Sequence, residues 1–304
     1  MQDLNTYYSC RNRYDQSFGA RMSLKTRVRM HPVMWRLVAL NNRLGGLRTT
    51  VLYDHRKKSD KPKIFAVTHI GKKDIEITTA VIRDHYFLLS GDYEHMCGTP
   101  EEKLLAVNGV VYVRKDDRED RRRCKDKMVE LLKQGGNIMY FPEGVWNFTE
   151  NLPLRRCPYG IIDVAMRGDA EIIPVAVEQY GQEYVTAVGE NFSVEGYSSS
   201  DKLQAIEDLR NTMATLKWDI WDYATRTKGT VPEERQIFEN QVAKNLAQWT
   251  APPSFIEKTT FHPKGIVNEK EVYDFLPSLP LGEHNAFLAK IKLQYLNTHG
   301  LVKD

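Results

Sequence analysis

The stretch KIFAVTHIGKKDIEITTAVI, residues 63–82, places two polar side chains between an apolar run and a segment that can start a helix. The run KIFAV is typical of a buried strand, and DIEITTAVI predicts a helix that begins at Asp74. His69 therefore follows the end of a strand, and Asp74 opens the next helix. Active residues of α/β domains gather at the carboxyl ends of strands, and a helix N-terminus there attracts anions. This stretch predicts an α/β domain with His69 and Asp74 at one edge of its sheet.

The spacing H-x-x-x-x-D occurs three times in the 304 residues, so spacing alone does not choose a site. His55 and Asp60 lie in DHRKKSDKP, a polar, lysine-rich stretch typical of a solvated turn. His299 and Asp304 lie at the C-terminus, where fraying is expected. Only His69 follows a buried strand. We therefore expect His69 to be the general base and Asp74 to be the carboxylate that orients it, with a strand-end histidine beside a helix-capping aspartate as the alternative.

Seven β-rich runs separated by helical or loop stretches occupy the chain between about residues 47 and 190. They are LRTTVLYD, KIFAVT, HYFLLS, GVVYVR, NIMYF, EIIPVAVE and EYVTAVG. The clearest helix between them is about 118–134, where apolar side chains repeat at helical spacing and Gly135 ends the pattern. These runs predict a mixed, partly parallel sheet of about seven strands, flanked by helices.

The chain divides by composition into a basic N-terminal segment (1–48), an α/β core (49–195) and a helical C-terminal extension (196–304). In the extension, apolar spacing predicts a helix from Leu203 to Ile220, a second that Pro232 opens, and a third near 284–297. The segment 21–46 mixes arginines with apolar side chains and contains no acid. We expect Pro32 to divide it into two short pieces and Gly45-Gly46 to end the second.

The charge is concentrated in the N-terminal segment. Residues 1–48 carry nine Lys/Arg and two Asp, a net charge of +7, whereas the remaining 256 residues carry a net charge of −4. A basic amphipathic segment suits a membrane surface, an acidic carrier protein or a packed position on the body of the protein. No apolar run is long enough for a transmembrane helix, and four widely spaced cysteines favour reduced thiols. We expect a cytoplasmic protein, peripheral to the inner face of the membrane, with no nucleic-acid partner.

Three further stretches carry residues suited to ligand contact. NGVVYVRK places Arg114 five residues after Gly109 at the end of a β run, where a guanidinium can bind a phosphate or carboxylate. In GGNIMYFPEGVWN, the turn Glu143-Gly144 follows a strand, and glycine lets the backbone approach a ligand. In EIIPVAV, Pro174 lies inside a strand, where proline is normally excluded except at an edge or bulge.

The order THIGKKD, GVVYVR, YFPEG and IIPVAV over about 110 residues resembles the lysophospholipid, or glycerolipid, acyltransferase family. The resemblance covers about residues 60–190. It implies that His69 is the general base, that Asp74 orients it, and that Gly109, Arg114 and the Glu143-Gly144 turn bind the acceptor. Pro174 would shape the wall beside the acyl chain.

The resemblance also implies transfer of an acyl group from acyl-CoA or acyl-carrier protein to an acceptor hydroxyl, with no metal or prosthetic group. The chain departs from the family where Asn-His becomes Thr68-His69, and where Glu-Gly-Thr-Arg becomes Glu-Gly followed by Val145-Trp146. The missing arginine leaves Lys72, Lys73, Arg155 and Arg156 as replacement cations, or Trp146 and Phe148 as a more apolar acceptor site. Transfer to an amine, and a non-catalytic lipid-binding protein of the same fold, are the alternatives. The sequence leaves the acceptor, chain length and oligomeric state open.

Overall fold

The structure is a computed structural model that describes residues 4–71, 73–91, 98–147 and 152–228, and parts of 236–298. By its internal contacts the chain forms two compact units, Met1–Thr259 and Thr260–Asp304. The second contains the described helix α11 (Ala289–Thr298). The domain boundaries at 48/49 and 195/196 stay predictions.

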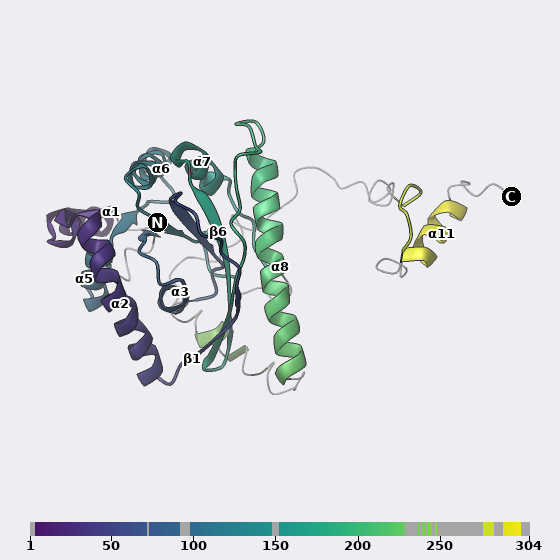
Figure 1. The fold of residues 1–304 in the computed structure, drawn as a ribbon, viewed down its shortest axis with the longest axis horizontal. Helices are drawn as coiled ribbons and strands as arrows, with labels where there is room; N and C mark the ends of the chain where they lie inside the picture. Colours follow the sequence, from purple (N-terminus) through teal and green to yellow (C-terminus); the bar gives the residue numbers. More distant parts are fainter. Residues whose placement is uncertain are drawn as a thin grey trace. The chain divides into compact units, whose positions relative to one another are not determined.

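A seven-stranded sheet is the centre of the first unit (Figure 1). Its strands are β1 (Arg48–Asp54), β2 (Lys63–Val67), β3 (Phe87–Ser90), β4 (Val110–Tyr112), β5 (Ile138–Tyr140), β6 (Glu171–Tyr180) and β7 (Glu183–Val188). Their order is β1-β7-β6-β2-β5-β3-β4, and every neighbouring pair is parallel except β6 and β7. The predicted mixed, partly parallel sheet is confirmed, and each of the seven β-rich runs forms one strand.

Helices cover both faces of this sheet (Figure 1). The described helices of the first unit are α1 (Leu4–Gln16), α2 (Leu24–Leu44), α3 (Asp74–Ile82), α5 (Pro100–Asn108), α6 (Arg118–Lys133), α7 (Gly160–Gly168) and α8 (Lys202–Lys228), with a short 3-10 helix at Gly19–Arg21. One core cluster joins α6, α7 and α8 to one face of the sheet, and a second joins α3 to the other face. Helix α2 packs on the outside of α3.

The central strand β2 and helix α6 show why these elements form. All four residues from Ile64 to Val67 are fully buried, because β2 lies between β5 and β6 with helices above and below. In α6 the side chain of Asp117 caps the N-terminus by accepting from the backbone N–H groups of Glu119 and Asp120. The predicted helix at about 118–134 is confirmed at Arg118–Lys133.

Two expectations about the N-terminal segment and the cysteines are wrong. Pro32 does not divide the segment, because α2 runs without interruption through it. Proline has no N–H, so α2 lacks one helical hydrogen bond at this point. The side chain of Arg36, one turn later, donates from Nη1 to the Pro32 carbonyl at 3.1 Å. Cys10 is disulfide-bonded, so the cysteines are not all reduced, whereas Cys124 and Cys157 are free and buried.

The inward face of α2 is polar. Arg27, His31 and Asn42 are buried, with exposed fractions of 5% or less. Arg27 donates to the backbone carbonyls of Ala106, at 3.0 Å, and Gly19. The His31 ring lies edge-on to the His85 ring, with 5.7 Å between centroids. Helix α2 is therefore attached to the body by the hydrogen bonds of Arg27, by the ring contact of His31 and by Leu24, which packs against the core.

The buried histidines under α2 predict a loss of stability in mild acid. Burial lowers the pKa of His85 from 6.5 to about 4 and also lowers the pKa of His31. Below pH 6.5 the unfolded chain binds a proton at residue 85 that the folded chain does not bind, so stability falls as the pH falls from 6.5 toward 4. For His85 alone the free energy of unfolding should drop by about 2 kcal/mol between pH 7 and pH 5.

Urea unfolding at the two pH values measures this loss. His85→Gln should reduce the difference between pH 7 and pH 5, since no imidazole remains there to be protonated. The exposed His55→Gln should leave the difference unchanged. An equal loss in His85→Gln and in the wild type would contradict the assignment.

Candidate active site

His69 and Asp74 meet at the carboxyl edge of β2. His69 lies two residues beyond the end of β2, and Asp74 is the first residue of α3. Nδ1 of His69 is 2.8 Å from Oδ2 of Asp74. The Asp74 side chain is completely buried, whereas the His69 side chain is 17% exposed. The carboxylate is thus enclosed, and the imidazole reaches solvent.

The carboxylate of Asp74 is fixed by the loop that joins the strand to the helix. Its Oδ2 also accepts from the backbone N–H groups of Ile70, at 3.0 Å, and Gly71, at 3.1 Å. The position at the N-terminus of α3 favours a negative charge. A carboxylate is an acceptor only, so His69 presents the protonated Nδ1 to it, and Nε2 remains as the acceptor that can take a proton.

Aromatic rings line one side of the imidazole. The ring of Phe141 lies 4.3 Å from the His69 ring, centroid to centroid, with a tilt of 31°. The Trp146 ring is edge-on at 6.1 Å. The backbone N–H of Asn147 donates to the carbonyl of His69 at 2.7 Å. The segment after β5 therefore packs against the catalytic candidate and excludes water from one side of it.

Glu143 is buried behind His69 and bonds to backbone. Its Oε1 accepts from the N–H of His69, and its Oε2 accepts from the N–H of Arg155, both at 2.9 Å. Burial raises the pKa of Glu143, and these two N–H bonds together with the charge of Lys217 oppose that increase. In the structure Glu143 holds two loops together, and each of its oxygens already has a backbone donor.

Gly144 needs glycine for its backbone conformation, because its φ is +70°. Its carbonyl accepts from Nζ of Lys115 at 2.6 Å. Lys115 follows Arg114, and its side chain passes so close to Gly91 that a Cβ there would clash with it. Lys115 therefore joins the loops after β3, β4 and β5 at the edge of the sheet where β2 ends.

Arg114 lies at this edge with its guanidinium engaged by its own loop. It pairs with Asp117 at 2.6 Å and with Asp116 at 3.2 Å, and its backbone N–H donates to Asp120. A phosphate would have to compete with these two aspartates. Acceptor binding by Arg114 stays a prediction.

Gly109 and Pro174 are placed away from His69. Gly109 lies at the amino end of β4, and because β4 runs parallel to its neighbours up to β2, this end is opposite the edge that carries His69. At φ +109° it packs against the Phe87 ring, where a side chain would clash. The structure therefore gives Gly109 a packing role and does not bring it to the site.

Pro174 is buried in β6 and lies opposite Ala66 of β2. Its carbonyl accepts from the N–H of Gly189, and it lies between the bridge of Ile172 to Phe192 and the ladder with β7 that begins at Val175, where the register is irregular, as at a bulge. This explains a proline within an interior strand. Its place beside the acyl chain stays a prediction.

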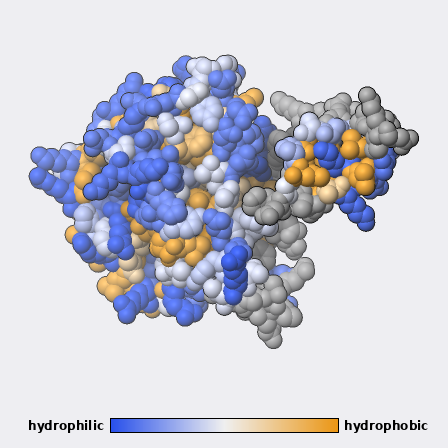
Figure 2. Space-filling view, turned by 45° about the vertical axis from the view of Figure 1, so that its right-hand side comes forward, coloured by the Kyte–Doolittle hydropathy of each residue, from blue (hydrophilic) through white to orange (hydrophobic). Residues whose placement is uncertain are grey.

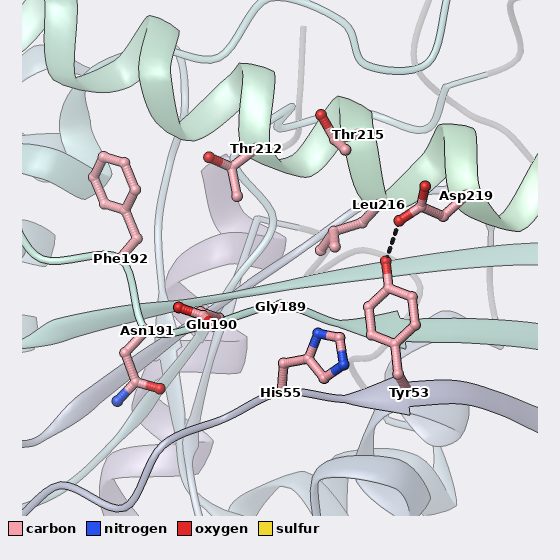
Figure 3. A pocket seen from close by; sticks show the side chains of 10 residues that line it. All are labelled: Tyr53, His55, Gly189, Glu190, Asn191, Phe192, Thr212, Thr215, Leu216 and Asp219. Atoms are coloured by element: carbon pink, nitrogen blue, oxygen red, sulfur yellow. Dashed lines mark hydrogen bonds between the residues drawn. The ribbon is translucent and has the colours of Figure 1, made fainter.

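The rejected histidines do not join this site. His55 is exposed, follows β1 and stacks on Tyr53 with 4.4 Å between centroids. Because β1 runs opposite to β2, His55 lies at the other edge of the sheet, beside a cavity of about 500 Å³ (Figure 3). The cavity is lined by Tyr53, His55, Gly189, Glu190, Asn191, Phe192, Thr212, Thr215, Leu216 and Asp219. His299 and Asp304 lie outside the described residues.

Of the cations considered as replacements for an arginine, Lys73 pairs with Glu76 at 2.6 Å, and Arg155 is buried beside Glu143. Lys72 and Phe148 lie outside the described residues. Lys115 is the cation that sequence reasoning missed. Its neighbour Arg114 carried the stronger pattern, and no sequence signal shows that residue 115 reaches the Gly144 carbonyl.

Thr68 occupies the position before the histidine and bonds to the neighbouring strand. Its hydroxyl accepts from the N–H of Val177 at 2.9 Å and lies 3.3 Å from the Val177 carbonyl. The side chain thus binds both backbone groups of one residue of β6, and a threonine in this place ties His69 to β6.

Part of the chain is similar to known proteins. Residues 48–178 match the family described as Acyltransferase. The 1-acyl-sn-glycerophosphate acyltransferase PlsC from Thermotoga maritima has a similar structure, with a TM-score of 0.53 and 14% identity. The match covers 71% of this chain and 93% of PlsC, and at this identity it shows the fold. No curated protein matches the chain.

The matched segment contains β1 through most of β6, and with them His69, Asp74, Glu143 and Gly144. The sheet with this site at the carboxyl edge of β2 is therefore the part of the chain that matches the acyltransferase family, and it has the fold of PlsC.

Proposed function

We propose that the protein transfers a fatty acyl group from the thioester of acyl-CoA or acyl-carrier protein to a hydroxyl of a glycerol-phosphate or lysophospholipid acceptor. The observation that carries the proposal is the His69–Asp74 pair, 2.8 Å apart, within an acyltransferase domain. The buried carboxylate and the partly exposed imidazole have the arrangement that general-base catalysis needs.

In this reaction His69 would first accept a proton and later donate it. Nε2 takes the proton of the acceptor hydroxyl as its oxygen attacks the thioester carbon, and Asp74 stabilises the imidazolium that forms. The C–S bond then breaks, and the leaving thiolate takes the proton back from Nε2. The products are an ester and a free thiol, and His69 returns to its starting state.

Two observations support a phosphate-bearing acceptor. Lys115 brings an ammonium group to the Gly144 carbonyl, next to the turn that follows β5. PlsC, whose fold this chain shares, acts on 1-acyl-sn-glycerophosphate according to its name.

An acceptor screen tests the proposal. The purified protein is incubated with labelled acyl-CoA or acyl-carrier protein and, separately, with glycerol 3-phosphate, a lysophospholipid and a set of amino acids, and the products are identified by mass spectrometry. We expect an O-acylated glycerolipid. An N-acylated product would show that the acceptor is an amine and not a hydroxyl. Lipid binding without thiol release would show a lipid-binding protein and not an enzyme.

We also propose that α2 places the protein on a membrane surface. Its outward face is apolar: Val33, Leu37, Leu40 and Leu44 repeat at spacings of three and four and are 52% to 79% exposed. Arg29, Arg36 and Arg43 are exposed beside them at a spacing of seven. Figure 2 shows hydrophobic side chains exposed in patches among hydrophilic ones on one face of the molecule. Within the described residues, no helix combines the length and hydropathy that crossing a bilayer requires.

Exposed leucines of α2 should contribute directly to vesicle binding. Leu37→Glu and Leu40→Glu each remove apolar contact and add a charge that anionic lipids repel, so we expect about a tenfold or greater loss of affinity for phosphatidylglycerol-containing vesicles. Co-sedimentation measures it, and binding by the wild type should weaken as salt rises. Leu203→Glu, at a 66% exposed position on α8, is the matched control. Equal binding by all three variants and the wild type would contradict a role for α2.

A further inference from the structure

Helix α8 lies outside the segment that matches the acyltransferase family, yet two of its cations reach the back of the active site. Arg210 and Lys217 are seven residues apart, which places them on one side of the helix two turns from each other. The same side buries Leu209, Met213, Leu216 and Ile220 against the sheet and α7. Two cations on an apolar side require an explanation, because a methionine would pack there without the cost of burying a charge.

Arg210 donates hydrogen bonds to the peptide group that Glu143 also binds. Its Nη2 donates to the carbonyl of Leu154 at 3.1 Å, and its Nε donates to the carbonyl of Arg155 at 3.3 Å. The N–H of the Leu154–Arg155 peptide group donates to Oε2 of Glu143. One peptide group therefore lies between the guanidinium on one side and the carboxylate on the other.

Lys217 is buried against β6. It is 3% exposed, and its Nζ donates to the carbonyl of Val177 at 3.0 Å and pairs with Glu178. The indole N–H of Trp221, one turn along α8, donates to the same Glu178 oxygen at 3.0 Å. The ammonium is therefore enclosed, and two acceptors fix its position, one of which Trp221 also holds.

Val177 connects Lys217 to His69. The hydroxyl of Thr68 brackets the N–H and carbonyl of Val177, and the next N–H along the chain, that of His69, donates to Oε1 of Glu143. Arg210 thus ends on one of the two loops that Glu143 joins, and Lys217 ends on the residue of β6 that binds Thr68, next to His69 in the other loop. Lys217 also adds a positive charge that favours the ionised form of Glu143.

We propose that Arg210 and Lys217 are positioning residues for acyl transfer. From α8, Arg210 holds the Leu154–Arg155 peptide group that Glu143 binds, and Lys217 holds Val177, whose backbone binds the hydroxyl of Thr68 next to His69; together they fix the backbone that carries His69. The proposal rests on His69 being the general base. It makes α8 a part of the catalytic unit, so the family-matched segment alone would not hold His69 in its working place. Misplacing a catalytic group by about 1 Å can cost about 10²-fold in rate.

The test compares Arg210→Met and Lys217→Met with the conservative variants Arg210→Lys and Lys217→Arg. Arg226→Met is the matched control, because Arg226 is a 77% exposed cation of α8 that pairs within the helix, with Asp222. Two quantities are measured: kcat and KM for acyl transfer, and hydrogen exchange of the His69 and Arg155 backbone amides, which does not depend on activity.

We expect Arg210→Met and Lys217→Met to lower kcat by about 10- to 100-fold with KM changed less than about threefold, and both amides to exchange faster. The conservative variants should recover most of kcat, and Arg226→Met should match the wild type. Arg210→Met, which loses a partly exposed side chain, decides the question if Lys217→Met does not fold.

Wild-type kcat and unchanged amide exchange in both methionine variants, with His69→Ala inactive, would overturn the positioning role alone. A wild type that transfers no acyl group would overturn the proposed function. The amide exchange then still decides whether α8 clamps the site: faster exchange than in Arg226→Met supports it, and equal exchange overturns it.

Discussion

His69→Ala is expected to lower kcat for acyl transfer by about 10²- to 10⁴-fold, the range typical of general-base assistance. The variant loses the nitrogen that accepts the hydroxyl proton and leaves the Asp74 carboxylate without its imidazole. Binding should change little, because the contacts of Glu143 and of the Asn147 N–H are made by the backbone of residue 69, which alanine retains.

His55→Ala is the matched control, since His55 belongs to another H-x-x-x-x-D sequence and lies at the opposite edge of the sheet. It should keep wild-type kcat and KM. If His69→Ala and His55→Ala lost kcat to the same extent, or if both kept it, His69 would not be the base.

Asp74→Asn is expected to lower kcat by about 10²-fold or more while KM stays within about threefold. The amide oxygen can still accept from the Ile70 and Gly71 N–H groups, so the loop between β2 and α3 should keep its shape. The lost charge no longer stabilises the imidazolium that forms when Nε2 takes the proton.

Steady-state kinetics and a thermal unfolding curve separate these effects from loss of the fold. Asp60→Asn, the exposed acid of the rejected H-x-x-x-x-D sequence, should be indistinguishable from the wild type. Retention of full kcat in Asp74→Asn would make Asp74 a helix cap without a part in the reaction.

Strong local patterns explain why so much of the fold could be predicted from the sequence. The seven strands are short apolar runs bounded by polar turns, and the run that forms β2 is buried on both faces, which leaves it no polar positions that would confuse the pattern. The His69–Asp74 pair was also predictable, because both residues belong to one strand–loop–helix stretch.

Features that depend on distant contacts were not predictable. Pro32 remains inside α2, a helix whose buried side carries Arg27, His31 and Asn42. No local pattern in the sequence shows that α1, α3 and the start of β3 will pack against the polar side of α2. The sequence predicted that Gly109 binds substrate. Because β4 runs parallel to β3, Gly109, at the amino end of β4, lies at the edge of the sheet opposite His69.

The roles of Glu143, Arg210 and Lys217 were hidden for the same reason. The turn containing Glu143 was visible, yet its two donors come from residues 69 and 155. Arg210 and Lys217 lie 55 and 40 residues from the carbonyl groups that they bind. A cation on an otherwise apolar helix side is a weak signal in a single sequence.

We propose above that this site moves an acyl group from a thioester to an acceptor hydroxyl. The most direct measurement follows thiol release from acyl-CoA by the purified protein with and without a glycerol-phosphate or lysophospholipid acceptor, together with the amount of acylated product. We predict that release requires the acceptor and that each thiol released corresponds to one ester formed. Release that is independent of every acceptor, or acyl-CoA binding with no release, would contradict the claim.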